Sequence, residues 1–237
     1  VRQAKTLSDE QRVELLLLET EYHILSSQAN EALEKLRQLA VRFPDQTKTL
    51  RTRLLFARAQ VGSGGDLVPA GLAELKTLVA EQADTPEAVA AEVELILHGL
   101  IANPEALPPL VAWIKAHGDH DSAGAARRRL IEAIGNLLST ADPAVKIGPE
   151  SELSETDKLA LSTAAEAYPL LVRVEGAQAL TQQLLSHVEQ RYVANKSYPA
   201  AEAAVKQLLD MPLPPSETAA AEGLLTRMAD AVAADAY

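Results

Sequence analysis

Apolar residues recur along this chain at intervals of three and four, which is the spacing of one face of an α-helix. The clearest case lies within residues 32–45, where Leu33, Leu36 and Leu39 precede Pro44. Proline disfavours helical geometry in the residue before it, so we expect this helix to end there. No stretch alternates convincingly between apolar and polar residues with a period of two, and the pattern predicts an all-α protein of about ten or eleven helices in antiparallel pairs.

Capping residues and prolines set the expected ends of the helices. The first predicted helix starts at Ser8, which has the spacing of a capping box with Gln11. Its helical period is carried by Leu15, Leu18, Tyr22 and Leu25. The other predicted helices cover residues 29–42, 47–61, 69–81, 86–101, 108–116, 122–138, 154–167, 170–194, 199–209 and 216–234. Pro169 is expected to interrupt the chain before the longest of them.

The leucine pattern of residues 32–45 returns further along the chain. Residues 71–84 carry Leu72, Leu75 and Leu78 in the same places, after a step of about 39 residues that falls within the range of helical repeats. This repetition predicts an α-solenoid, a stack of antiparallel helix pairs. Residues 139–153 contain Pro143, Gly148 and Pro149 with little periodicity, so we expect a loop there. This loop would separate an N-terminal half at residues 1–138 from a C-terminal half at residues 154–237. The alternative is that the two halves form one continuous solenoid.

The segment around residues 32–45 resembles the second helix of a tetratricopeptide repeat. Ala32, Leu36, Leu39 and Pro44 stand at the spacings of that family's small, large, small and proline positions. A weaker match consists of Ala201, Val205, Leu208 and Pro212, and the family's first-helix roles would fall to Leu15, Leu18 and Tyr22. The resemblance implies a tetratricopeptide-like solenoid that binds a protein or peptide on its concave surface, and repeats of the HEAT type remain the alternative.

Charge and composition narrow the range of partners. The net charge of −11 argues against nucleic acid and against anionic membrane surfaces, because both attract cationic proteins. No apolar run approaches the roughly 18 residues of a membrane span. Cysteine is absent, which removes disulfides and thiolate metal sites. We therefore expect a soluble protein with no cofactor and no direct membrane insertion, in either the cytoplasm or the periplasm.

Motifs for catalysis are lacking. The chain has no nucleophile elbow, no phosphate-binding loop and no His-Glu-x-x-His zinc motif. His117 and His120 stand with Asp119 and Asp121 in a group that can be read as a zinc site, but the residues are also those of an ordinary turn. We expect the turn, and a chain that is not an enzyme.

Four residues are predicted to bind the partner. Arg51 and Arg58 share one helix face, because they differ by only about 20° at 100° per residue. Arg127 lies nearest the apolar side of its helix, and Trp113 is the only tryptophan. Guanidinium groups on a concave surface can hold an acidic peptide through paired hydrogen bonds. The alternatives are that the arginines pair with carboxylates of the same chain and that Trp113 packs in the core.

Two functions follow from these patterns. The first is a non-enzymatic scaffold that binds a protein or peptide, with an acidic peptide as the expected ligand of the arginines. The second is a helical accessory domain of a larger bacterial protein, such as a thiol-redox or envelope-assembly protein, whose chemistry lies elsewhere. The second is motivated by a chain that begins with Val1 and not with methionine.

Overall fold

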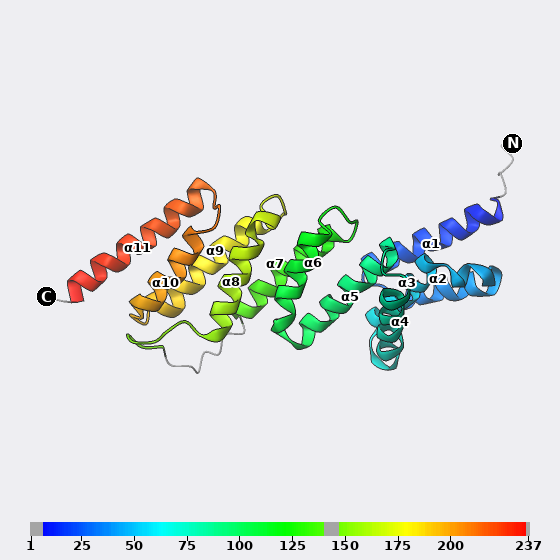
Figure 1. Cartoon of the computed structure of the whole chain (residues 1–237), viewed down its shortest axis with the longest axis horizontal. Helices are drawn as coiled ribbons and strands as arrows, with labels where there is room; N and C mark the ends of the chain where they lie inside the picture. Colours follow the sequence, from blue (N-terminus) through cyan, green and yellow to red (C-terminus); the bar gives the residue numbers. More distant parts are fainter. Residues whose placement is uncertain (1–6, 140–146, 236–237) are drawn as a thin grey trace. The chain divides into compact units, whose positions relative to one another are not determined.

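The computed structural model describes residues 7–139 and 147–235, and every regular element within these ranges is helical (Figure 1). The α-helices of these ranges are α1 Asp9–Leu25, α2 Ala29–Arg42, α3 Leu50–Ser63, α4 Val68–Glu81, α5 Pro86–Ala102, α6 Leu107–Ala116, α7 Ala123–Ser139, α8 Glu155–Leu171, α9 Ala177–Val188, α10 Tyr198–Leu209 and α11 Pro215–Asp235. A π-helical turn, Glu189–Val193, follows α9 directly. The described residues contain no strand, which confirms the predicted all-α class. In the same part of the chain, no helix combines the length and apolar character that crossing a membrane requires.

Side-chain caps fix where several helices begin. The Ser8 hydroxyl accepts a hydrogen bond from the Gln11 N–H at 3.3 Å, and the Gln11 side chain accepts one from the Ser8 N–H at 3.0 Å. This is the predicted capping box. Thr49 caps α3 through the Thr52 N–H, and Ser154 caps α8 through the Asp157 N–H. Each cap satisfies a backbone donor that has no partner within the helix.

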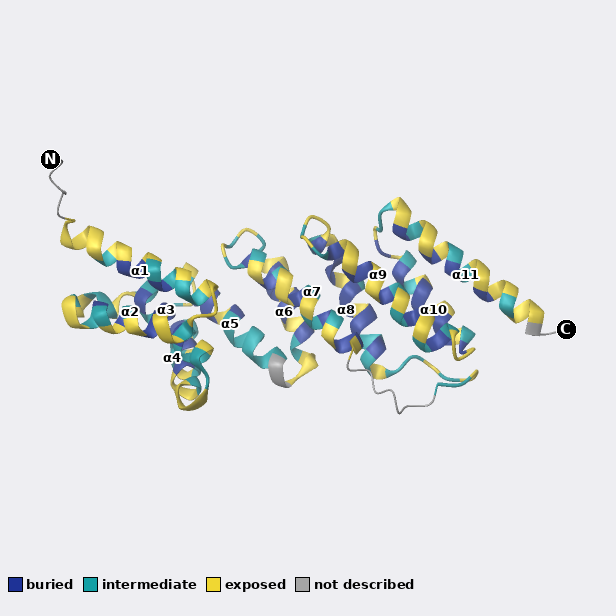
Figure 2. Ribbon diagram, turned by 180° about the vertical axis from the view of Figure 1, so that it is seen from behind, coloured by how far each residue is buried: buried dark blue, intermediate teal, exposed yellow. Residues whose placement is uncertain are grey.

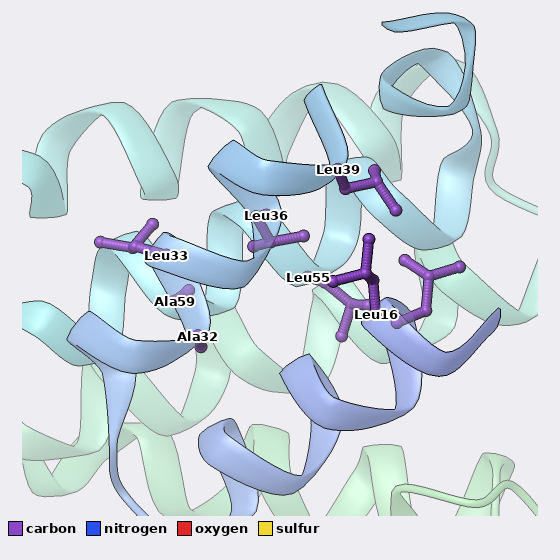
Figure 3. Packing of buried hydrophobic residues seen from close by; sticks show 8 residues of the cluster. Leu16, Ala32, Leu33, Leu36, Leu39, Leu55 and Ala59 are labelled. Carbon is purple, nitrogen blue, oxygen red and sulfur yellow. The ribbon is translucent and has the colours of Figure 1, made fainter. Parts of the chain in front are cut away.

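Backbone contacts divide the chain into two compact units, Val1–His98 and Gly99–Tyr237. In the first unit, α1 packs against α2 and α3, and α3 packs against α4. Figure 3 shows the core between the first three helices, which is formed by Leu16, Leu17, Ala32, Leu33, Leu36, Leu39, Leu55 and Ala59. Leu36 and Leu39 are fully buried. The leucine pattern that predicted α2 is therefore the face with which α2 enters the core.

Helix α3 is buried on two sides. Leu55 and Ala59 face the core with α1 and α2, whereas Leu54 and Ala57 belong to a second core. The other buried members of that second core are Leu75 and Leu78 of α4 and Ala90 and Ala91 of α5. Because α3 contributes to both cores, it links the successive helix pairs of this unit.

In the second unit, each helix packs against the next helix and against the one after it. Thus α6 contacts α7 and α8, α7 contacts α8 and α9, α8 contacts α9 and α10, and α9 contacts α10 and α11. Many residues at these contacts are fully buried alanines, among them Ala126, Ala160, Ala164, Ala167, Ala201 and Ala204. Small side chains let helices approach closely, which suits a chain with only 3% aromatic residues.

Two expectations around Pro169 are wrong. Pro169 lies inside α8, which continues for two residues beyond it and ends at Leu171. The predicted long helix over residues 170–194 does not begin there, since the chain turns at residues 172–176 and α9 starts at Ala177. Gly176 adopts a φ of 96°, a left-handed conformation that glycine accepts without strain. Apolar residues on both sides of this turn continue the helical spacing, so the sequence pattern does not show that one helix ends and another begins.

The expected boundary at residues 139–153 can be followed only in part, because residues 140–146 lie outside the described ranges. Residues 147–154 are not helical. Ser197, the residue before α10, holds this segment through a hydrogen bond from its hydroxyl to the Ser151 carbonyl at 2.7 Å. Helices α7 and α8, on the two sides of the expected boundary, pack together within the second unit.

Candidate protein-interaction surface

One face of α1 exposes large apolar side chains to solvent. Its members are Leu15, Leu18, Tyr22 and Leu25, which are 45%, 50%, 65% and 84% exposed. In Figure 2, α1 is coloured mainly as exposed or intermediate, with few buried residues. We call these four residues the α1 outer stripe. Contiguous exposed apolar groups of this kind mark sites of interaction in proteins.

The α1 outer stripe lies opposite the face that α1 buries. At 100° per residue, its four residues fall within about 80° of the helix circumference. The buried residues of α1 are Leu16, Leu17 and Thr20, whose mean direction is roughly 170° away from that of the stripe. A helix that is apolar on two opposite sides is typical of a position between two neighbours. The first-helix residues of the predicted repeat, Leu15, Leu18 and Tyr22, thus lie on the side away from the core.

Carboxylates border the α1 outer stripe on both sides. Glu14 and Glu21 lie along one edge, and Arg51 of α3 holds both of them, with a nitrogen–oxygen distance of 2.9 Å to each. Glu19 lies along the other edge and pairs with Lys35 of α2 at 2.6 Å. All three glutamates remain more than a third exposed. The stripe is therefore an apolar seam whose acidic edges are held in place by cations from the neighbouring helices.

The predicted arginines of α3 contact carboxylates of the same chain. Arg58 Nε lies 2.8 Å from Glu94 of α5, while Arg51 pairs with α1. Arg53 of the same helix reaches Glu74 at 2.6 Å. Arg51 and Arg58 consequently tie α3 to different neighbours, and an acidic peptide would have to compete with glutamates that already occupy the guanidinium groups.

Arg127 and Trp113 both hold the turn after α6. Arg127 donates a hydrogen bond to the Gly118 carbonyl at 3.0 Å. Trp113 is 4% exposed, and its ring packs against those of His117 and His120, with centroid distances of 5.1 and 6.0 Å. Arg51 and Arg58 belong to the first unit, whereas Arg127 and Trp113 belong to the second. Trp113 is packed in the core, which was one of the two positions expected for it.

A buried ionic network joins the start of α8 to the end of α9. Asp157 is fully buried, with one carboxylate oxygen 2.7 Å from His187 Nε2. The other oxygen accepts hydrogen bonds from the hydroxyls of Ser154 and Tyr192, and Arg191 Nε lies 3.2 Å from it. The π-helical turn carries Arg191 and Tyr192, and such turns are often found at functional positions.

The network keeps the Asp157 carboxylate ionised. Burial by itself would raise the pKa of Asp157, but hydrogen bonds from His187, Ser154 and Tyr192 outweigh it and hold the pKa at about 2. Burial and the hydrogen bond to Asp157 raise the pKa of Tyr192. Each polar side chain of this network contacts another of its members, so the network holds α8 and the end of α9 together. We call the network of Ser154, Asp157, His187, Arg191 and Tyr192 the clasp.

Sequence reasoning did not find this network, because its members lie far apart in the chain. His187 and Tyr192 follow Asp157 by 30 and 35 residues. The only local signal is Ser154 three residues before Asp157, which also has the spacing of an ordinary helix cap.

Two features of the described residues bear on metal and ligand binding. No group of three or more histidine, aspartate or glutamate side chains there is placed to hold a metal ion. An open depression of about 460 Å³ lies beside α7 and α9, lined by Ile131, Glu132, Gly135, Asn136, Ser139 and Gln183. The depression contains one carboxylate and no cation, so it brings together no set of catalytic groups.

No protein-family model matches this chain, and no curated protein sequence matches it significantly.

Proposed function

We propose that this chain is a non-enzymatic, tetratricopeptide-like scaffold that binds a partner protein through the α1 outer stripe. The observation that carries the proposal is the pair of opposite apolar faces on α1, of which the chain's own core covers one. Burying an exposed Leu or Tyr side chain is favourable, at roughly 25 cal/mol per Å² of apolar surface. The stripe therefore offers a driving force for association.

The order of helix contacts in the second unit supports a stack of hairpins. Contacts between each helix and the two that follow it are those expected when α6, α8 and α10 form one layer and α7, α9 and α11 form a second. The residues that resemble the second helix of the repeat also take core positions, whereas the first-helix residues Leu15, Leu18 and Tyr22 are exposed. Ala32, Leu36 and Leu39 on α2, and Ala201, Val205 and Leu208 on α10, are all fully buried.

The resemblance implied a ligand on a concave surface lined by the arginines, whereas the proposed binding surface is the α1 outer stripe. Arg51 holds two glutamates of α1 and Arg58 holds one of α5. In the proposed function, Arg51 acts indirectly, by fixing Glu14 and Glu21 beside the stripe. The scaffold is proposed to lack catalysis because the sequence has no nucleophile elbow, no phosphate-binding loop and no His-Glu-x-x-His motif.

Affinity capture from an extract of the source cells tests this proposal. The bait is the full chain, compared with a Leu18→Asp/Tyr22→Asp variant. The matched control is Val172→Asp/Val232→Asp, which adds the same two charges at apolar positions that are 51% and 47% exposed in the second unit. We expect a protein that is retained by the unmodified chain and by the control, and lost from the α1 variant. Equal retention by all three baits would contradict the proposal.

A further inference from the structure

The α1 outer stripe has the spacing of a helix–helix seam. Leu15, Leu18, Tyr22 and Leu25 are separated by three, four and three residues, which are the a, d, a and d positions of a heptad. Side chains at these positions pack into the spaces between the side chains of a facing helix that runs lengthwise. The stripe runs from Leu15 to Leu25, so it can present about 15 Å of seam at 1.5 Å per residue.

In this register, the acidic edges take the positions that choose the partner. Glu14 and Glu21 stand at g positions and Glu19 at an e position, the places whose charges lie across the seam from those of a facing helix. All three are more than a third exposed. Their intrachain contacts with Arg51 and Lys35 hold the carboxylates at the edges of the stripe, where a second cation can approach them.

The same charges disfavour a second copy of this chain as the occupant. A parallel pair of α1 helices would set Glu14 of one copy against Glu19 of the other. An antiparallel pair would bring Glu21 against Glu21, or Glu19 against Glu19. Like charges facing each other at e and g positions oppose pairing and direct a helix towards a complementary partner.

We infer that the α1 outer stripe pairs with one amphipathic helix of a different protein, with leucine-like residues at its a and d positions and lysine or arginine at its e and g positions. This inference rests on the proposed function, which it sharpens by naming the partner's secondary structure and charge. The apolar seam supplies most of the attraction, and the glutamates select the basic helix over an acidic one.

Three synthetic peptides of about three heptads each test the inference by fluorescence anisotropy with the full chain. The first carries Leu at a and d and Lys at e and g. The second replaces Lys with Glu, and the third keeps Lys but places Ser at a and d. We expect the first peptide to bind about tenfold or more tightly than either of the others, and its affinity to fall with added salt.

The variants show whether binding occurs at the stripe. Leu18→Asp/Tyr22→Asp should abolish binding of the first peptide, whereas Val172→Asp/Val232→Asp, with the same net charge, should leave it unchanged. Circular dichroism and the Tm of both variants establish that they are folded. Binding that survives the α1 substitutions would overturn the inference, because it would then reflect only the net charge of −11.

Other outcomes separate the inference from the proposed function. If the acidic peptide binds as well as the basic one, or if neither binds, the stated partner is wrong, while the capture experiment still decides whether the stripe binds a protein. A dimer of the unmodified chain in sedimentation velocity, abolished by Leu18→Asp/Tyr22→Asp, would also overturn it, because the occupant would then be a second copy.

Discussion

Helices α1 and α2 are neighbours that both carry leucines at helical spacing, yet the leucines of the α1 outer stripe and those of α2 have opposite environments. Leu33, Leu36 and Leu39 of α2 are at most 4% exposed. Leu18 and Leu25 of α1, which are also spaced for a helix, are at least half exposed. The comparison shows that a helical period identifies an apolar face but does not say whether the same chain covers it. For the face that α1 leaves open, we propose that a partner protein covers it.

Ionic groups show the same contrast between enclosed and open positions. Asp157 is fully buried and contacts four side chains, whereas the Arg51 pairs lie at a surface that is about one-third exposed or more. Breaking a buried pair leaves an uncompensated charge and is costly, while an exposed pair contributes little. The clasp is therefore expected to stabilise the second unit, and the Arg51 pairs to shape the edge of the α1 surface.

The largest expected effect on stability is that of truncating Leu36, a buried leucine of α2. Leu36→Ala should lower the free energy of unfolding by about 2–5 kcal/mol, through lost burial and the cavity that remains. Leu18→Ala should change it by less than about 0.5 kcal/mol, because the Leu18 side chain is half exposed. Urea titration of both variants measures the difference. Similar losses for the two would show that the α1 outer stripe is packed in the native protein.

The next effect concerns the buried carboxylate. The pKa of Asp157 is about 2 in the folded chain, against an ordinary value of 3.8, a difference worth about 2 kcal/mol. Because the folded pKa is the lower one, this stabilisation is present above pH 3.8 and is lost as the pH falls towards 2. Asp157→Asn removes this charge and with it the ion pair to Arg191, so it should be less stable by at least about 2 kcal/mol at pH 7.

Stability measured from pH 7 down to pH 2 in both proteins checks this prediction. Their difference should shrink only in the acid range, and using the difference removes the contribution of the other carboxylates. A difference that stays constant with pH would mean that the charge of Asp157 does not stabilise the fold.

A smaller effect is expected at the edge of the stripe. Arg51→Gln should cost less than about 1 kcal/mol of stability, because its pairs are partly exposed and screened by salt. Thermal unfolding at low and high salt measures this cost. Loss of the fold on this substitution would assign Arg51 a structural role in place of its proposed role in orienting Glu14 and Glu21.

The all-α class and most helix ends could be predicted from local signals. Ser8 with Gln11, and Pro44 after α2, act within a few residues of themselves, so their effect can be read directly. The prediction for Pro169 was wrong because the effect of a proline depends on its place in the helix. No local signal in the sequence shows that Pro169 lies in the last turn of α8. The turn at residues 172–176 lies between apolar residues that keep the helical period.

The candidate surface was harder to predict, because it depends on which face of α1 meets the core. Leu15 and Leu18 are exposed while Leu16 and Leu17 are buried, and the pattern within α1 supports either choice. The contacts of Arg51 with Glu14 and Glu21 span 37 and 30 residues, so spacing along the chain cannot reveal them. Pairing of the arginines with carboxylates of the same chain was one of the two interpretations of these residues, but the particular partners of Arg51 and Arg58 could not be predicted.

Site-specific photo-cross-linking is the most direct measurement of whether the α1 outer stripe is a binding surface. A photoreactive side chain is placed at Leu18 in one protein and at Val172, the equally exposed control position, in another, and each is irradiated in the source cells. We predict an adduct with a different protein from position 18 that is absent from position 172, with the cross-linked residue lying in a basic amphipathic helix. No adduct from position 18, or the same adducts from both positions, would contradict the proposed role of the stripe.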